Sequence, residues 1–142
     1  MNLLNNDPNF SIVLPGGCNA NCDFCFASSK PSKTTLSKYL VNLSKTLESL
    51  PKEFYQISIT GGEPGISPWL NHVLELISEH REKYTNILLT TNGTNLLENK
   101  DIIATAVDHI NISRHHYNQI ENKKIFKGTY NITDEYLERW VD

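Results

Sequence analysis

The sequence is short of the residues that several classes of binding site need. It has three cysteines and no fourth, whereas structural zinc sites use four ligands and two-cluster ferredoxins use more cysteines. It has no run of lysine or arginine, and its net charge is −3, so a nucleic-acid partner is not supported. No apolar stretch approaches the length that spans a bilayer, so no membrane partner is expected.

The rest of the composition is that of an ordinary soluble domain. Residues 1–7 have neither a basic start nor an apolar run, so we expect no signal peptide. The cysteines lie in one short segment without partners elsewhere, which fits a reducing compartment, so we expect a cytoplasmic protein. The 142 residues, 39% of them hydrophobic, have room for one domain over residues 1–142.

All the cysteines fall within eight residues, in the pattern C-x3-C-x2-C formed by Cys18, Cys22 and Cys25. Three thiolates from one loop suit a cubane [4Fe–4S] cluster, in which each thiolate binds one iron and the fourth iron stays open to a small molecule. A zinc site is an alternative. A redox dithiol of Cys22 and Cys25 is another, although it leaves Cys18 unexplained.

Strand and helix patterns alternate along the chain. Apolar and alternating runs predict strands over residues 11–14, 54–60, 87–91 and 110–113. Helical spacing predicts helices over residues 34–50, from a cap at Ser67 followed by Pro68, over residues 102–107, and after a cap at Thr133. The segment through Lys123 and Lys124 reads as a polar loop. Strands joined by helical crossovers must be parallel, so we expect an α/β fold.

Each distinctive loop follows one of these strands. The cysteines follow the first strand, Gly61-Gly62-Glu63-Pro64 the second, residues 90–93 the third, and residues 113–116 the fourth. In parallel α/β folds, binding sites form outside the carboxyl ends of the strands. The four loops are therefore expected to share one functional rim.

The cysteine spacing, with Phe24 just before the last cysteine, and the Gly-Gly-Glu-Pro segment resemble the signature of the radical S-adenosylmethionine (radical SAM) superfamily. The resemblance implies that the amino and carboxylate groups of SAM chelate the open iron. Reductive cleavage of SAM then yields a 5′-deoxyadenosyl radical, which abstracts hydrogen from a substrate. An electron donor such as flavodoxin or ferredoxin is implied, and the fold is a (β/α)6 barrel.

The resemblance also suggests roles for single residues. The backbone of Phe24 would contact the adenine. The segment Gly61, Gly62 and Glu63 would hold the methionine ammonium through carbonyl and carboxylate oxygens. Ser113 matches the position that hydrogen-bonds the ribose, and Arg114 beside it would neutralise the SAM carboxylate.

Residues that reach towards substrate are weaker candidates. Thr90, Thr91 and Asn92 lie where members of the superfamily approach their substrates, although Asn92-Gly93 is equally a common turn. His115 and His116 are possible substrate contacts because imidazole titrates near neutrality. The substrate, a small molecule or a peptide, is not identified. No cysteine remains for an auxiliary cluster, so nothing in these residues points to a peptide-modifying subclass.

The chain departs from the superfamily in length. About four parallel βα units are present, so we expect a partial barrel that stops before the fifth and sixth strands. The last strand would then expose a parallel edge, which isolated proteins avoid. A missing C-terminal segment or a homo-oligomer would cover that edge. The alternative to an enzyme is a non-catalytic iron–sulfur or SAM-binding module without a complete substrate pocket.

Overall fold

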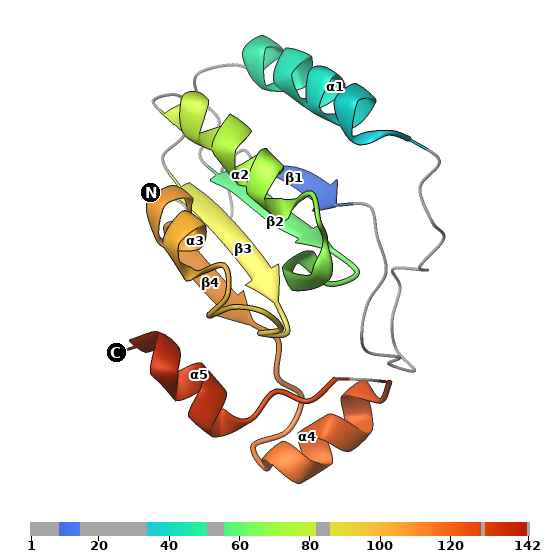
Figure 1. Ribbon diagram of the computed structural model, residues 1–142, viewed down its shortest axis with the longest axis vertical. Coiled ribbons are helices and arrows are strands. Elements are labelled where there is room, and N and C mark those ends of the chain that lie inside the picture. Colours follow the sequence, from blue (N-terminus) through green and yellow to red (C-terminus); the bar gives the residue numbers. More distant parts are fainter. Residues whose placement is uncertain (1–8, 15–33, 51–55, 82–85, 129, 142) are drawn as a thin grey trace, which may run out of the picture.

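The computed structural model describes residues 9–14, 34–50, 56–81, 86–128 and 130–141. Its strands are β1 (Asn9–Leu14), β2 (Gln56–Gly61), β3 (Asn86–Thr91) and β4 (His109–Ile112). Its helices are α1 (Leu36–Ser49), a short 3-10 helix η1 (Pro64–Ile66), α2 (Leu70–Glu79), α3 (Lys100–Ala106), α4 (Gln119–Phe126) and α5 (Asp134–Val141). Strands and helices alternate as the sequence predicts (Figure 1).

The four strands form one sheet in the order β1-β2-β3-β4, and every neighbouring pair is parallel. The predicted α/β class with four parallel strands is therefore confirmed. In the register, Leu14 pairs with Gly61, and Thr91 pairs with Ile112. The carboxyl ends of the strands consequently lie along one rim, where the loops singled out in the sequence begin.

One face of the sheet carries the hydrophobic core. Alternate strand residues are buried beneath α1, α2 and α3, which lie on the same side of the sheet in Figure 1. The helices contribute residues at helical spacing, such as Leu43 and Leu47 of α1. Burying one such side chain completely stabilises the fold by about 1.5–3 kcal/mol, so this face holds the sheet and helices together.

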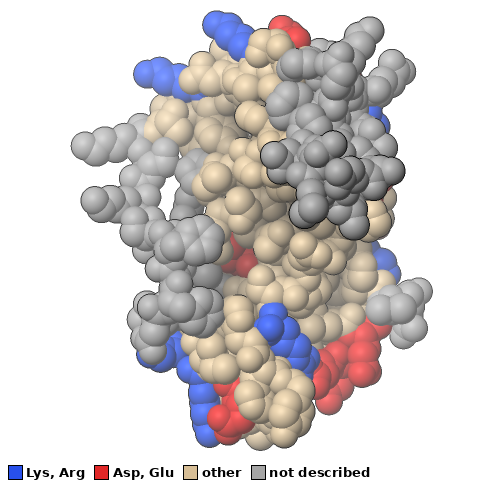
Figure 2. Space-filling model, turned by 180° about the vertical axis from the view of Figure 1, so that it is seen from behind, with Lys and Arg blue, Asp and Glu red and all other residues tan. Residues whose placement is uncertain are grey.

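The opposite face of the sheet is polar. Across its strands, the Ser58 hydroxyl donates to Asn9 Oδ1 at 2.8 Å, and Asn86 Nδ2 donates to Gln56 Oε1 at 3.0 Å. Seen from behind in Figure 2, the middle of the visible surface consists mainly of residues other than Lys, Arg, Asp and Glu. Charged side chains gather towards the upper and lower ends of that view.

The second helix begins later than predicted. Ser67 closes η1, and its hydroxyl accepts the N–H of Trp69 at 3.3 Å, whereas α2 starts at Leu70. The predicted cap at Ser67 was therefore wrong about the first helical residue, because a turn over Pro68 and Trp69 separates Ser67 from α2. By contrast, α1 has the expected start, with Thr35 accepting the N–H of Lys38.

The predicted polar loop through Lys123 and Lys124 is wrong, because both residues lie in α4. Asn118 caps this helix, its Oδ1 accepting the N–H groups of Ile120 and Glu121 at 2.9 and 3.2 Å. The helix has few apolar residues, which left no periodic pattern to detect. α4 and α5 lie beyond the carboxyl ends of the strands (Figure 1). Within the described residues, no helix is both long and apolar enough to cross a membrane.

Candidate functional site

The carboxyl ends of β2 and β3 are joined by a buried carboxylate. Glu63 follows β2 and is only 3% exposed. Its Oε1 accepts the N–H of Gly65 at 2.7 Å and the hydroxyl of Thr91, and its Oε2 accepts the N–H of Asn92 at 2.6 Å. One side chain therefore connects the Gly-Gly-Glu-Pro turn to the turn that follows β3.

Burial and hydrogen bonding act on the Glu63 carboxylate in opposite directions. Removal from water raises its pKa, while hydrogen bonds from Thr91, Asn92 and Gly65 lower the pKa, and burial is the larger effect. In the described part of the chain, none of the ion pairs includes Glu63. A buried anion held only by neutral donors is a favourable place for a positively polarised ligand group.

Two glycines of this segment lie too close to other backbone atoms to carry a side chain. A Cβ on Gly61 would lie 2.7 Å from the carbonyl oxygen of Leu14, and the φ of Gly61 is +152°. A Cβ on Gly65 would lie 1.9 Å from the carbonyl oxygen of Thr94. Glycine at these positions therefore lets β1, η1 and the turn after β3 approach one another.

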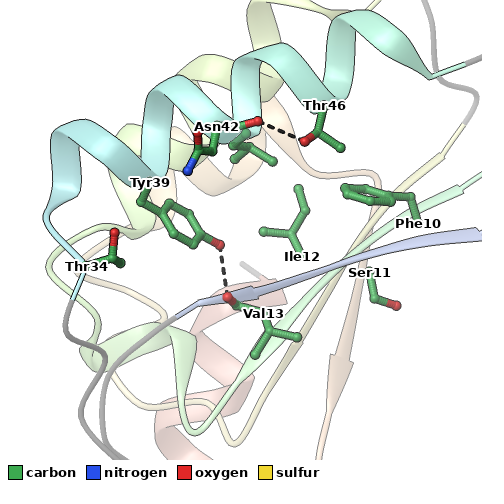
Figure 3. Close-up of a pocket in the computed structure, with 9 residues that line it drawn as sticks. Phe10, Ser11, Ile12, Val13, Thr34, Tyr39, Asn42 and Thr46 are labelled. Atoms are coloured by element: carbon green, nitrogen blue, oxygen red, sulfur yellow. Dashed lines mark hydrogen bonds between the residues drawn. The ribbon is translucent and has the colours of Figure 1, made fainter.

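The predicted cluster ligands Cys18, Cys22 and Cys25, together with Phe24, lie outside the described residues. The described chain that leads into this segment ends with β1, at Leu14. The Tyr39 hydroxyl of α1 donates to the carbonyl oxygen of Val13 at 2.9 Å, and burial raises the pKa of Tyr39 (Figure 3). This bond fixes the carboxyl end of β1, from which the cysteine segment departs.

A groove of about 350 Å³ opens between the outer edge of β1 and α1. In Figure 3 the ring of Tyr39 reaches across it from α1 to β1, and Phe10 and Ile12 point into it from the strand. Thr34, Asn42 and Thr46 add polar groups to its helical side. The groove lies beside the strand that leads to the cysteines.

The predicted substrate residues of β3 fall in two environments. Thr90 is half-buried, and its side chain lies on the face of the sheet away from the core, because strand residues alternate between faces. Asn92 is buried at 5% exposure, and its Oδ1 accepts the N–H and the hydroxyl of Thr94 at 3.0 and 2.5 Å. These bonds make Asn92 a turn-forming residue and give no support to a substrate contact.

The predicted SAM-binding residues after β4 also differ from one another. The N–H of Ser113 donates to the carbonyl oxygen of Thr91 at 2.8 Å, so Ser113 lies at the rim, beside the end of β3. The guanidinium of Arg114 instead pairs with Asp134 and donates to the carbonyl oxygens of His116 and Tyr117. These contacts stabilise the chain between β4 and α5, and none of them supports the predicted role at the SAM carboxylate.

His115, another candidate substrate residue, holds α4 in place. Its N–H donates to Asn122 Oδ1 at 2.8 Å, and its ring packs on Phe126 with a centroid separation of 4.9 Å. Asn122 is buried and its Nδ2 also donates to the hydroxyl of Tyr130. In the described residues, no group of histidine, cysteine, aspartate and glutamate side chains could hold a metal ion.

The sequence indicated Glu63 but not the residues that hold its carboxylate. Thr91 was grouped with Thr90 and Asn92 as a residue near the substrate, not as a partner of Glu63, and Gly65 was not singled out. A sequence signal for Thr91 does exist, because a threonine as the last residue of a buried strand faces the rim. That signal is weak without knowing that β2 and β3 are neighbours.

Comparisons with known proteins found a matching family model and several relatives. The model of the radical SAM superfamily matches residues 12–142. An S-adenosylmethionine-dependent nucleotide dehydratase of Flammeovirga pacifica is 33% identical over 132 residues, covering 87% of this chain and 43% of the relative. A 7-carboxy-7-deazaguanine synthase of Methanothermobacter thermautotrophicus is 36% identical over 99 residues, covering 68% of this chain and 37% of the relative.

Solved structures show the same fold at low sequence identity. Streptococcus suis SuiB bound to its precursor peptide SuiA superposes with a TM-score of 0.63 at 19% identity, covering 83% of this chain and 27% of SuiB. SuiB bound to S-adenosylmethionine superposes with the same TM-score at 18% identity. The chain thus spans less than half the length of these relatives.

Proposed function

Because this chain belongs to the radical SAM superfamily, we propose that it binds one [4Fe–4S] cluster and SAM and takes part in radical chemistry. Cys18, Cys22 and Cys25 would hold the cluster. Three thiolates at this spacing fit a cubane that keeps one open iron. Phe24 would contact the adenine, and Ser113 the ribose.

The observation that best supports the proposal is the environment of Glu63. Its carboxylate is buried, has no cationic partner among the described residues, and accepts only one hydrogen bond at Oε2. An amino group that binds iron through its nitrogen keeps N–H donors, and one of these would suit the remaining acceptor site of Oε2. The close approach at Gly61 would keep the carbonyl groups of the same segment within reach of that amino group.

When bound, the cluster and SAM would supply the chemistry, the one-electron reductive cleavage of SAM to a radical able to abstract hydrogen from a substrate. The chain itself would bind and orient SAM and exclude water from the rim. An external donor such as flavodoxin or ferredoxin would supply the electron.

The substrate class follows from the relatives only in outline. One relative is a nucleotide dehydratase, another is a deazaguanine synthase, and SuiB was solved with a precursor peptide. We propose a small-molecule or peptide substrate, with Thr90 as the described rim residue best oriented to contact it. No nucleic-acid partner is proposed.

Anaerobic reconstitution tests the proposal. The chain is loaded with iron and sulfide, reduced with dithionite and supplied with SAM, and 5′-deoxyadenosine is quantified by chromatography. Formation of 5′-deoxyadenosine supports the enzyme. A stable cluster without SAM cleavage supports the alternative, a non-catalytic iron–sulfur or SAM-binding module. Bound zinc or the absence of any metal would overturn both.

The cluster ligands are tested by one substitution and a matched control. Cys22→Ala removes a thiolate that the cluster needs, so both the cluster absorbance and SAM cleavage should be lost. Ser29→Ala changes a neighbouring residue that is not a predicted ligand and should keep both. Survival of cluster absorbance in the Cys22→Ala protein would contradict the ligand assignment.

A further inference from the structure

We propose that Thr91 is a positioning residue for the amino group of SAM, which it orients through the carboxylate of Glu63. The inference rests on the proposed function and adds to it a residue that the superfamily motifs in the sequence do not mark. Thr91 is the last residue of β3 and is 3% exposed. Thr91 would not contact SAM itself but would act through the side chain of Glu63.

The direction of the hydrogen bonds follows from the donors present. Thr91 Oγ1 accepts the N–H of Gly93 at 3.0 Å. Because an amide nitrogen can only donate, the hydroxyl proton of Thr91 remains free to be given to Glu63 Oε1. The Thr91 hydroxyl thus connects the turn after β3 to the Glu63 carboxylate, which follows β2, by two hydrogen bonds.

The two carboxylate oxygens of Glu63 therefore accept different numbers of hydrogen bonds. Oε1 accepts two hydrogen bonds, from Thr91 and from the N–H of Gly65, whereas Oε2 accepts one, from the N–H of Asn92. A carboxylate oxygen has two lone pairs in its plane, so Oε1 is saturated and Oε2 keeps one acceptor position. A ligand N–H is therefore directed to Oε2.

Thr91 is held firmly enough to perform this role. Its carbonyl oxygen accepts the N–H of Ser113 at 2.8 Å, and it pairs with Ile112 in the sheet. The hydroxyl is thus fixed by the β3–β4 ladder on one side and by the Gly93 turn on the other. Without it, the carboxylate would lose a donor at Oε1 and could rotate to offer either oxygen.

Equilibrium binding of two ligands tests the inference. SAM is compared with an analogue of SAM whose amino group is replaced by hydrogen, by calorimetry on the cluster-loaded chain. The wild-type protein should prefer SAM. Thr91→Val keeps the side-chain shape but removes the hydroxyl, and we expect that preference to fall about tenfold, the order expected for a hydrogen bond to a charged group. Affinity for the analogue should change little.

Two further variants serve as controls. Thr91→Ser restores the hydroxyl and should restore the preference for SAM. Thr105→Val makes the same change in α3, where the hydroxyl donates to the carbonyl oxygen of Asp101, and should leave the preference unchanged. If Thr91→Val does not give folded protein, Thr91→Ala replaces it with the same expectation.

The outcomes separate this inference from the proposed function. Equal weakening of SAM and analogue by Thr91→Val would mean a merely structural role and would overturn the inference, as would an unchanged preference. If the wild-type protein binds SAM without preferring it to the analogue, the inference also falls, whereas the proposed cluster and SAM chemistry stands. If the wild-type protein binds neither ligand, the proposed function fails as well.

Discussion

Glu63 is an unfavourable residue for stability in the position that it occupies. Its carboxylate is buried against neutral donors, and burial raises its pKa despite three hydrogen bonds. A neutral side chain would relieve the cost of burying the charge. Proteins keep such groups where binding needs them, and this agrees with a ligand-binding role for Glu63.

The pH dependence of stability should reveal this buried carboxylate. Because the pKa of Glu63 is raised from its ordinary value of 4.5, the folded chain holds the proton more tightly than the unfolded chain does. Its contribution to the free energy of unfolding is then complete below 4.5 and is lost as the pH rises through the raised pKa. Each unit of that increase corresponds to about 1.4 kcal/mol.

In the Glu63→Gln protein, the free energy of unfolding should not show this fall with rising pH. Urea denaturation of the two metal-free proteins, from about pH 4.5 to about pH 7.5, should show the wild-type protein losing stability relative to the variant as the pH rises. The pKa of the nearby Tyr130 is raised mainly by burial and less by Glu63, so its hydroxyl stays neutral throughout this range. A stability difference that is constant with pH would contradict a raised pKa.

Gly65 gives a second prediction for a single residue. The methyl group of Gly65→Ala would lie 1.9 Å from the carbonyl oxygen of Thr94, a backbone atom that cannot move without opening the turn after β3. We expect a loss of about 3 kcal/mol or more in the free energy of unfolding, measured with denaturant. A loss below about 1 kcal/mol would show that η1 and this turn separate easily.

Among the helices, α5 is anchored to the turn that carries Asn92. The hydroxyl of Tyr136 accepts the N–H of Leu97 at 3.0 Å and donates to Glu98 Oε2 at 2.5 Å. This hydrogen bond also lowers the pKa of Glu98. α5 therefore covers the loop between β3 and α3, where Leu137 also lies close to Gly93.

Tyr136→Phe should weaken this anchor. Losing both hydrogen bonds should cost about 1–2 kcal/mol at neutral pH, because the Leu97 N–H loses its acceptor. Burial, followed by the bond to Glu98, raises the pKa of Tyr136 from 10.0 to about 12. The wild-type protein should therefore lose this stability between pH 10 and about 12, and the variant should not.

Thermal unfolding at a series of pH values checks this prediction. Tyr117→Phe is the matched control, because Tyr117 is 87% exposed and its hydroxyl lies away from the core. That variant should unfold like the wild-type protein throughout the range. If the Tyr136→Phe protein loses as much stability at alkaline pH as the wild-type protein, a group other than Tyr136 causes the loss.

For the molecule as a whole, the sequence predicted the layers well and the contacts poorly. Strand positions and the parallel order follow from apolar alternation and from helical crossovers, both of which are local patterns. The cap of α1 is equally local, since Thr35 bonds to Lys38. The start of α2 was missed because the turn over Pro68 and Trp69 has no periodic signature.

The roles at the rim depended on contacts between distant segments. Arg114 lies beside the predicted ribose-binding residue, yet its guanidinium pairs with Asp134, twenty residues later. His115 is likewise engaged by Asn122 of α4. Such partners depend on how α4 and α5 fold back over the strand ends, which no spacing rule predicts. Asn92 is the exception, because its side chain bonds to Thr94 within the turn that the Asn-Gly pair indicated.

The extent of the chain bears on its activity. It spans less than half of the relatives that it matches, and its sheet has four parallel strands, with β1 and β4 at the edges. The polar face opposite the core is suited to line a wet cavity rather than to pack against an apolar layer. The pocket for a substrate would therefore need a further wall beyond the described residues.

The central claim is that three cysteines hold a cluster whose open iron binds the amino group of SAM. Electron–nuclear double resonance of the reduced, reconstituted chain with SAM labelled by nitrogen-15 at the amino group tests it most directly. We predict a hyperfine coupling between the labelled nitrogen and the cluster that disappears in the Cys22→Ala protein. A reduced cluster whose signal shows no coupling to the label at saturating SAM would contradict the account.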